Sequence, residues 1–171
     1  MNIAIIGGGI SGASMAYHLK ILCNATCHLY EKNFALGQEG SGNPVAIVQP
    51  QYFSGTRREF HRLAYSYTHA LYRREFSDCV GEIGSIRSLS GKNKYRNITN
   101  ENFGHFQLGE IISKEEARVQ LGLDTIAEEQ YLWSPSALAV YTAPIIAKLS
   151  ESADRHLEAR ISDVQEMEDK V

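Results

Sequence analysis

The chain has 171 residues, of which 43% are hydrophobic, and its formal net charge is −3. This composition is typical of a globular domain with its own core, and it gives no overall attraction to nucleic acid or acidic lipid. No apolar run approaches the length of a membrane span, and the N-terminal segment lacks the basic flank of a signal peptide. We therefore expect a cytoplasmic protein without a membrane partner.

The N-terminal segment predicts a strand, a glycine-rich turn and a helix. A strand over about residues 2 to 6 leads into Gly7, Gly9 and Gly12, which form G-x-G-x-x-G at the start of a helix over about residues 10 to 22. In this pattern the first glycine permits the tight turn and the second lets a pyrophosphate approach the backbone, while the third lets the helix pack closely on the strand. The free N–H groups of the helix then face the phosphates.

An acidic residue ends the second predicted strand. The strand covers Thr26 to Glu31, and Glu31 lies nineteen residues beyond Gly12. The dinucleotide-binding fingerprint expects a carboxylate about 20 residues on, where it hydrogen-bonds the adenosine ribose. A carboxylate at that place disfavours a 2′-phosphate and therefore NADP. We favour the nucleotide interpretation over an ordinary glycine-rich turn with a surface glutamate, because the motif stands between a strand and a helix.

The segment from Lys32 to Pro44 contains three glycines and an Asn-Pro step, so it predicts a loop. Two interpretations of its Ser41, Gly42 and Asn43 stay open. The loop is either a plain surface connection or a second contact to a phosphate or flavin, because successive N–H groups can converge on an anion.

Residues 57 to 77 predict a long helix that begins with a capping box formed by Thr56 and Glu59. Its predicted apolar stripe consists of Phe60, Leu63, Ala64, Tyr67 and Leu71. Arginines surround this stripe at positions 57, 58, 62, 73 and 74. We favour a solvated helix face over a nucleic-acid contact, because the chain as a whole is acidic.

The second half of the chain predicts shorter elements. They are a strand over 84–90, a polar loop over 92–104, a strand over 107–112, a helix from the Ser113 capping box to Gly122, a strand over 130–133, a helix from near Pro144 with Ile145, Ile146, Leu149 and Ala153 on one face, and two short strands within 156–171. The three cysteines, Cys23, Cys27 and Cys79, form no C-x-x-C and have no histidine at zinc spacing, so we expect reduced thiols and no metal site.

Together these features resemble the FAD-dependent amine oxidoreductases of the D-amino-acid oxidase and glycine oxidase type. Three stretches carry the resemblance, namely the opening through Glu31-Lys32, the loop 40–44 with Gln49-Pro50, and residues 112–123 with 131–149. The Ser-Gly-Asn loop is similar to that of the tRNA-modifying branch. The chain departs from that branch at Gly40, at Gln49 and at residues 133–136, which lack its Gly-Gly-Trp sequence.

The resemblance implies an α/β fold with an incomplete Rossmann-like FAD/NAD(P)-binding domain and the start of an antiparallel β substrate domain. Residues 1–80 would be the first part of the FAD-binding domain, 81–135 the start of the substrate domain, and 136–171 a truncated return segment. It also implies a third sheet strand beyond Val171 and a C-terminal half that this chain lacks. The chain would then be a truncated gene product, a fragment, or one piece of a split protein whose missing half a partner chain could supply.

The implied activity is FAD-dependent oxidation of the CH–NH group of a secondary amine, in the tRNA branch the carboxymethylaminomethyl group of a wobble uridine. The alternatives are a glycine- or sarcosine-like small-amine oxidase, and a non-catalytic remnant that needs a partner. No residue is assigned as catalytic. The expected FAD contacts are Gly7, Gly9, Ile10, Ser11, Gly12, Glu31, Lys32, Ser41, Gly42 and Asn43.

Overall fold

The structure is a computed structural model and describes residues 1–50, 58–89 and 109–165. By its internal contacts the chain divides into two compact units, one of residues 1–46 and 141–171 and the other of residues 47–140. The chain contains both helices and strands, with parallel and antiparallel pairs, which confirms the predicted α/β class. The domain boundaries predicted after residues 80 and 135 stay a prediction. Within the described residues, no helix is long and apolar enough to cross a membrane.

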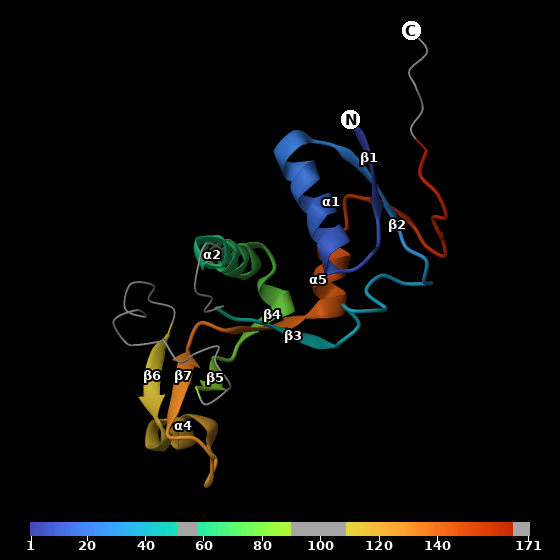
Figure 1. The fold of residues 1–171 in the computed structure, drawn as a ribbon. Helices are drawn as coiled ribbons and strands as arrows, with labels where there is room; N and C mark the ends of the chain where they lie inside the picture. The colour runs from blue at the N-terminus through green and yellow to red at the C-terminus, as the bar shows by residue number, and fades with distance from the viewer. Residues whose placement is uncertain (51–57, 90–108, 166–171) are drawn as a thin grey trace. The chain divides into compact units, whose positions relative to one another are not determined.

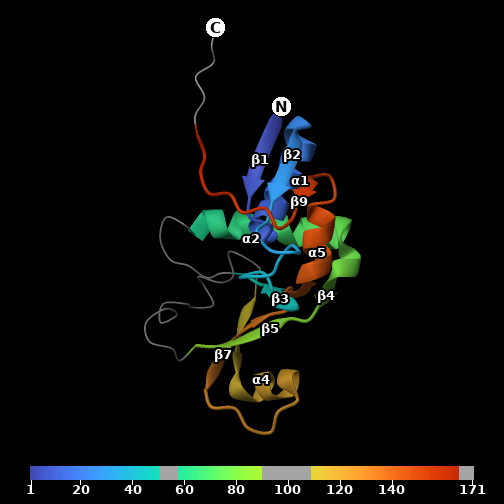
Figure 2. The same ribbon diagram turned by 90° about the vertical axis from the view of Figure 1, so that its right-hand side faces the viewer.

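The first unit contains a three-stranded parallel sheet with the order β1-β2-β9 (Figure 2). Its strands are β1 (Asn2–Ile6), β2 (Thr26–Tyr30) and β9 (Asp154–His156). The first two match the prediction. The third strand corrects it. The resemblance implied a third strand beyond Val171, and the sequence predicted two short strands within 156–171, whereas β9 lies at Asp154–His156. The structure has no strand in 157–165. The three residues of β9 are all exposed and polar, so no apolar alternation marks them.

Two helices pack together in this unit, as Figure 1 shows. They are α1 (Ile10–Cys23), which also packs on β1 and β2, and α5 (Thr142–Leu149). The buried core between α1 and the sheet consists of Ile5, Ala16, Ala25, Cys27, Leu29 and Ala153. The predicted apolar face of α5 is buried at Ile145, Ile146 and Leu149, while Ala153 lies beyond the end of the helix.

The helix α2 (Arg58–Glu75) lies in the second unit, and here the predicted apolar stripe is wrong. Of its members only Leu71 is buried, whereas Phe60, Leu63 and Tyr67 are all more than half exposed. The buried residues are Tyr65, Leu71, Tyr72 and, after the helix, Phe76. Tyr65 and Tyr72 are themselves spaced seven residues apart, so the sequence contains two apolar stripes at helical spacing. The predicted Thr56 cap lies outside the described residues.

Two small sheets follow. One has the order β3-β8-β4 and the other, which is antiparallel, the order β5-β7-β6. The bounds are β3 Val45–Val48, β4 Val80–Glu82, β5 Ser85–Ser88, β6 Glu110–Ser113, β7 Gln130–Ser134 and β8 Leu138–Tyr141, with a 3₁₀ turn at Ser77–Cys79. The strands β4 and β8 were not predicted. The predicted polar loop 92–104 lies outside the described residues.

The short helix α4 (Lys114–Leu121) follows β6 and confirms its predicted ends. The Ser113 hydroxyl accepts a hydrogen bond from the Glu116 N–H, and the Glu116 carboxylate accepts one from the Ser113 N–H. This reciprocal pair is the capping box. Gly122 ends the helix with φ of +63°, a left-handed conformation that favours glycine.

Candidate functional site

The turn between β1 and α1 has the geometry that the glycine pattern predicts. Gly7 has φ of +106°, which residues with a side chain rarely adopt. A Cβ atom at Gly12 would lie 2.0 Å from the Gly7 carbonyl oxygen and 3.3 Å from Cγ2 of Ile5. Because only a residue without Cβ fits there, Gly12 allows α1 to approach β1 closely.

The first turn of α1 leaves backbone N–H groups available. Gly9 is the N-cap and contributes no side chain, and its carbonyl accepts the first helical hydrogen bond, from Ala13 N at 3.0 Å. The Ile10 N–H donates to the Ser41 hydroxyl at 3.0 Å. Within the described part of the chain, the N–H groups of Ser11 and Gly12 have no acceptor. These N–H groups and the positive end of the helix dipole form an anion-binding arrangement.

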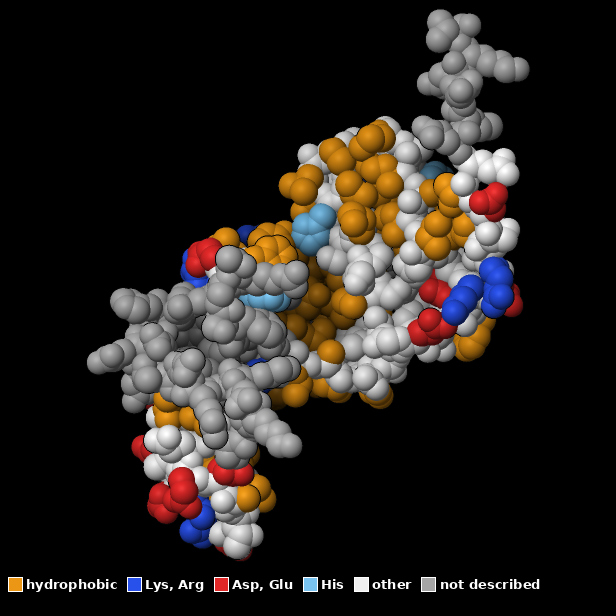
Figure 3. Space-filling model, viewed as in Figure 1, with side chains coloured by type: hydrophobic (Ala, Val, Ile, Leu, Met, Phe, Trp, Pro, Cys, Tyr) orange, Lys and Arg blue, Asp and Glu red, His pale blue; other side chains and the backbone are white. Residues whose placement is uncertain are grey.

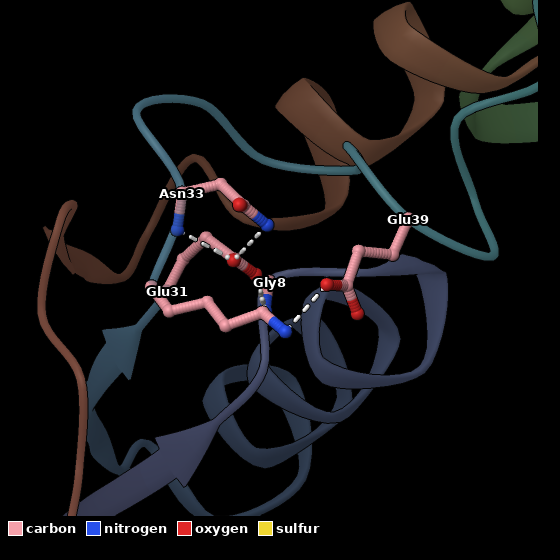
Figure 4. Close-up of polar contacts among 5 residues, drawn as sticks. Gly8, Glu31, Asn33 and Glu39 are labelled. Carbon is pink, nitrogen blue, oxygen red and sulfur yellow. Dashed lines mark hydrogen bonds and ion pairs between the residues drawn. The ribbon is translucent and has the colours of Figure 1, made fainter.

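Glu31 follows β2 and is only 7% exposed. Its Oε2 accepts the Gly8 N–H at 2.8 Å, and its Oε1 accepts two donors of Asn33, the backbone N–H at 2.9 Å and Nδ2 at 2.8 Å (Figure 4). A carboxylate has about four acceptor positions, so three are filled and one remains at Oε2.

The pKa of the Glu31 carboxyl is lowered from its ordinary value of 4.5. Burial by itself raises this pKa, but the hydrogen bonds from Asn33 and Gly8 and the nearby charge of Lys32 together outweigh burial. The group is therefore an acceptor-only carboxylate at neutral pH, ready to accept a hydroxyl.

Gly8 and Asn33 were not among the predicted site residues. A Cβ at Gly8 would lie 2.4 Å from Leu36 Cδ2 and 3.1 Å from Glu31 Oε2, so glycine lets the acid reach the turn. Two signals could have found them. Gly8 is the middle one of three consecutive glycines and stands at a position where the fingerprint requires none. An asparagine side chain commonly bonds to groups two residues away.

The loop after Glu31 folds onto the glycine turn. The Gly37 N–H donates to the Gly8 carbonyl at 3.0 Å, and Ser41 Oγ lies 3.1 Å from where a Cβ at Gly9 would stand. The structure thus brings Ser41 to the N-terminus of α1, and a side chain at Gly9 would crowd it.

The other loop residues expected at the site make different contacts. The Gly42 N–H donates to the Glu39 carbonyl at 2.7 Å, and the Asn43 carbonyl accepts the Thr142 hydroxyl. Lys32 Nζ pairs with Glu39 Oε1 at 2.5 Å, in a pair that is largely solvated. Within the described part of the chain, none of these three residues hydrogen-bonds to the glycine turn.

The site residues fit the ADP half of a dinucleotide. They offer available N–H groups, a turn with no side chain at Gly9 and a carboxylate with one open acceptor. Among the described residues, no group of histidine, cysteine or acidic side chains is arranged to hold a metal. Cys23 is exposed, Cys27 and Cys79 are buried, and all three are free thiols.

Comparisons with known proteins agree with this geometry. The family model described as FAD dependent oxidoreductase matches residues 2–165. A curated relative, the tRNA 5-methylaminomethyl-2-thiouridine biosynthesis bifunctional protein MnmC of Magnetococcus marinus, is 36% identical over 73 residues. Those residues are 42% of this chain and 11% of that protein.

Two solved structures are similar in fold. Glycine oxidase from Bacillus cereus matches with a TM-score of 0.68 at 18% identity, over 98% of this chain and 48% of that one. L-amino acid deaminase from Proteus vulgaris matches with a TM-score of 0.69 at 13% identity, over 92% of this chain and 39% of that one. The chain therefore spans less than half the length of each of these proteins.

Proposed function

The chain belongs to the family of FAD-dependent oxidoreductases, and on that premise we propose that its glycine turn and Glu31 bind the ADP half of FAD. The observation that carries this proposal is the open acceptor on Glu31 beside the available N–H groups of α1. The pyrophosphate would lie over Gly7 and Gly9 and accept from the N–H groups of Ser11 and Gly12. The adenosine ribose would donate a hydroxyl to Glu31.

The hydrogen bonds and ion pairs that the other expected contact residues already make indicate how each of them could meet FAD. Ile10 and Ser41 already line the turn, and we propose that the Ser41 hydroxyl donates to a phosphate while it accepts the Ile10 N–H. Lys32, Gly42 and Asn43 stay proposed contacts to the phosphates or the ring. Reaching a ligand would require Lys32 to leave Glu39.

FAD, when bound, supplies a hydride acceptor for oxidation of a carbon next to an amine nitrogen. The proposed substrate is a secondary amine, and the finer proposal is the carboxymethylaminomethyl group of a tRNA wobble uridine. The similarity to MnmC and the Ser-Gly-Asn loop support this substrate. The alternative is a small free amine, which the similarity to glycine oxidase supports at the level of fold.

The arginines of α2 give tRNA binding no additional support. Arg73 pairs with Glu82 at 2.5 Å and Arg74 with Glu75 at 2.6 Å, and Arg62 pairs with Glu59. These pairs reduce the positive potential of the helix, as expected of a solvated face. A tRNA substrate would therefore be held mainly by other surfaces of the complete enzyme.

We further propose that a partner segment completes the first unit, in the cytoplasm. In the described residues β1 is an edge strand of a parallel sheet, and its apolar residue Ile6 is 61% exposed. Parallel sheets are normally covered on both faces, and an open edge can pair with another strand. The occupant we propose is a polypeptide that adds a strand to β1 and carries the substrate pocket. A chain without it would bind FAD and not turn over.

The substrate proposal is tested by anaerobic loss of visible flavin absorbance in the FAD-loaded chain, with and without a separately expressed C-terminal half of a family member. With the C-terminal half present, we expect tRNA that carries the carboxymethylaminomethyl group to reduce the flavin and tRNA without it to leave the flavin oxidised. Without the C-terminal half, we expect no substrate to reduce the flavin. Reduction by glycine or sarcosine, with none by modified tRNA, would favour the small-amine alternative and contradict the proposal.

A further inference from the structure

We propose that Asn33 and Gly8 are positioning residues that aim the Glu31 carboxylate at one ribose hydroxyl. The inference rests on the proposed binding of FAD and deepens it, because it says how the site recognises an unmodified ribose. Gly8 occupies a variable position of the G-x-G-x-x-G pattern, and Asn33 lies two residues beyond its distal acid, so the pattern specifies neither residue.

The first support is the arrangement of donors around Glu31. Three N–H donors from two separate segments hold both oxygens at 2.8–2.9 Å, and the carboxylate is almost fully buried. Rotation of the carboxylate would break bonds at both oxygens at once. Its last acceptor position therefore has a fixed direction, which is what binding of one hydroxyl in one orientation requires.

The second support is that the backbone on both sides of this side chain is pinned by the segment around β9. The Glu31 N–H donates to the His156 carbonyl at 2.9 Å, and the Glu31 carbonyl accepts the Ala159 N–H at 2.9 Å. The Asn33 carbonyl accepts the Glu158 N–H at 3.0 Å. Backbone hydrogen bonds to residues 156–159 thus hold the main chain at both Glu31 and Asn33.

The third support is the chemistry of the remaining position. A carboxylate that already accepts three hydrogen bonds can accept a fourth from a hydroxyl, but it repels a phosphate at the same place. Asn33 contributes two of the three bonds, one from its backbone N–H and one from its side-chain amide. Its side-chain amide therefore governs how well the site tells a ribose with its hydroxyl from one without it.

The test is a thermodynamic cycle that combines one substitution in the protein with removal of one ribose hydroxyl from the ligand. The affinities are measured by titration calorimetry on the full chain. The ligands are ADP, 2′-deoxy-ADP and 3′-deoxy-ADP, and the variant is Asn33→Ala. We expect the wild-type chain to bind one deoxy analogue about tenfold more weakly than ADP, and the variant to reduce that ratio to about twofold or less. A ratio unchanged in the variant overturns the inference.

Asn33→Asp provides a readout that a merely structural role would not move. It keeps the size of the side chain and the backbone N–H but replaces the donor by an acceptor that repels Glu31. We expect its ADP affinity to be low at pH 7 and to rise toward about pH 5, as the new carboxyl takes a proton and can donate it. A pH profile parallel to that of the wild-type chain overturns the inference.

Gln38→Ala is the matched control, because it removes an amide of the same loop whose hydrogen bond within the described residues goes to the Leu36 carbonyl, at 3.4 Å. It should retain the wild-type ratio between ADP and its deoxy analogues, and a ratio reduced as in Asn33→Ala would overturn the inference. If the wild-type chain binds neither ADP nor FAD, the proposed function itself fails. If it binds ADP and both deoxy analogues equally, the positioning inference and the proposed ribose contact of Glu31 fail, while binding of the diphosphate at the glycine turn stands.

Discussion

At the residue scale, we expect both the stability of the fold and the proposed binding of ADP to depend on the Glu31 carboxylate. Since its folded pKa is lowered, folding is favoured by the ionised form at pH values above the ordinary value of 4.5. That contribution is lost as the pH falls below 4.5 and through the lowered folded pKa. The chain should therefore lose unfolding free energy on acidification in this range.

Glu31→Gln tests this linkage. The variant cannot supply the buried charge that the Gly8 and Asn33 donors satisfy, so we expect lower stability at pH 7 and a flatter dependence of unfolding free energy on pH below 4.5. Urea unfolding at a series of pH values measures both. Glu39→Gln is the control, because Glu39 lies in a solvated pair with Lys32, and it should leave the profile nearly unchanged. Equal profiles for the two variants would contradict the account.

Gly8→Ala tests the close approach of the acid to the turn. The added methyl would meet Leu36 Cδ2 at 2.4 Å and the Glu31 carboxylate at 3.1 Å, so we expect a loss of about 1–3 kcal/mol of stability and weaker ADP binding. Thermal unfolding and calorimetry measure the two effects. Gly40→Ala is the control, since a Cβ at Gly40 meets nothing within 4 Å. A similar loss in both variants would mean that the effect does not come from this contact.

At the element scale, local signals predicted ends of elements well and predicted buried faces less well. The Ser113 box and Gly122 were predictable because a cap depends on residues within one turn. The face of α2 was not, because two stripes have helical spacing and only tertiary contacts choose between them. Tyr65 belongs to the buried face, where its hydroxyl bonds to the carbonyl and hydroxyl of Ser136, both at 2.8 Å.

The candidate site divides in the same way. Gly7, Gly12 and Glu31 were predictable because the fingerprint fixes their spacing along the chain. Gly8 and Asn33 act through where the acid side chain lies in space, which spacing does not specify. β9 escaped prediction because its residues are polar and exposed, and its role is to pair with β2 and hold the backbone of Glu31.

Ser113→Ala tests the cap of α4. Loss of the hydroxyl leaves the Glu116 N–H without its acceptor, and we expect the unfolding free energy to fall by about 1 kcal/mol. The matched change is Ser113→Thr, which keeps the hydroxyl and should retain most of the stability. Chemical denaturation followed by circular dichroism measures both variants. An alanine variant as stable as the threonine variant would show that the cap contributes little.

At the scale of the whole molecule, the first unit exposes apolar surface that an isolated domain would cover. Met15, Ile21 and Leu22 of α1 are 54%, 54% and 79% exposed, and Figure 3 shows hydrophobic side chains gathered over this helix. Ala13 and Ala16 on its opposite side are fully buried. A helix that is apolar on both sides normally lies between two layers, so this surface fits the proposed partner segment.

The exposed surface predicts association of the isolated chain. We expect a concentration-dependent mass above the monomer's 19.1 kDa in light scattering coupled to size exclusion. The double change Met15→Lys and Leu22→Lys should shift the chain toward monomer. Gln38→Ala, in an exposed polar position, should not. A wild-type chain that stays monomeric at all concentrations would contradict the partner proposal and leave the FAD proposal standing.

The central claim is that the turn and Glu31 bind the ADP half of FAD, and a comparison of FAD with FMN tests it most directly. FMN carries the flavin and one phosphate but lacks adenosine and its ribose. In a flavin fluorescence titration of the purified chain, we predict saturable binding of FAD that ADP competes away, and much weaker binding of FMN. FMN binding as tight as FAD binding, or no binding of either flavin, would contradict the account.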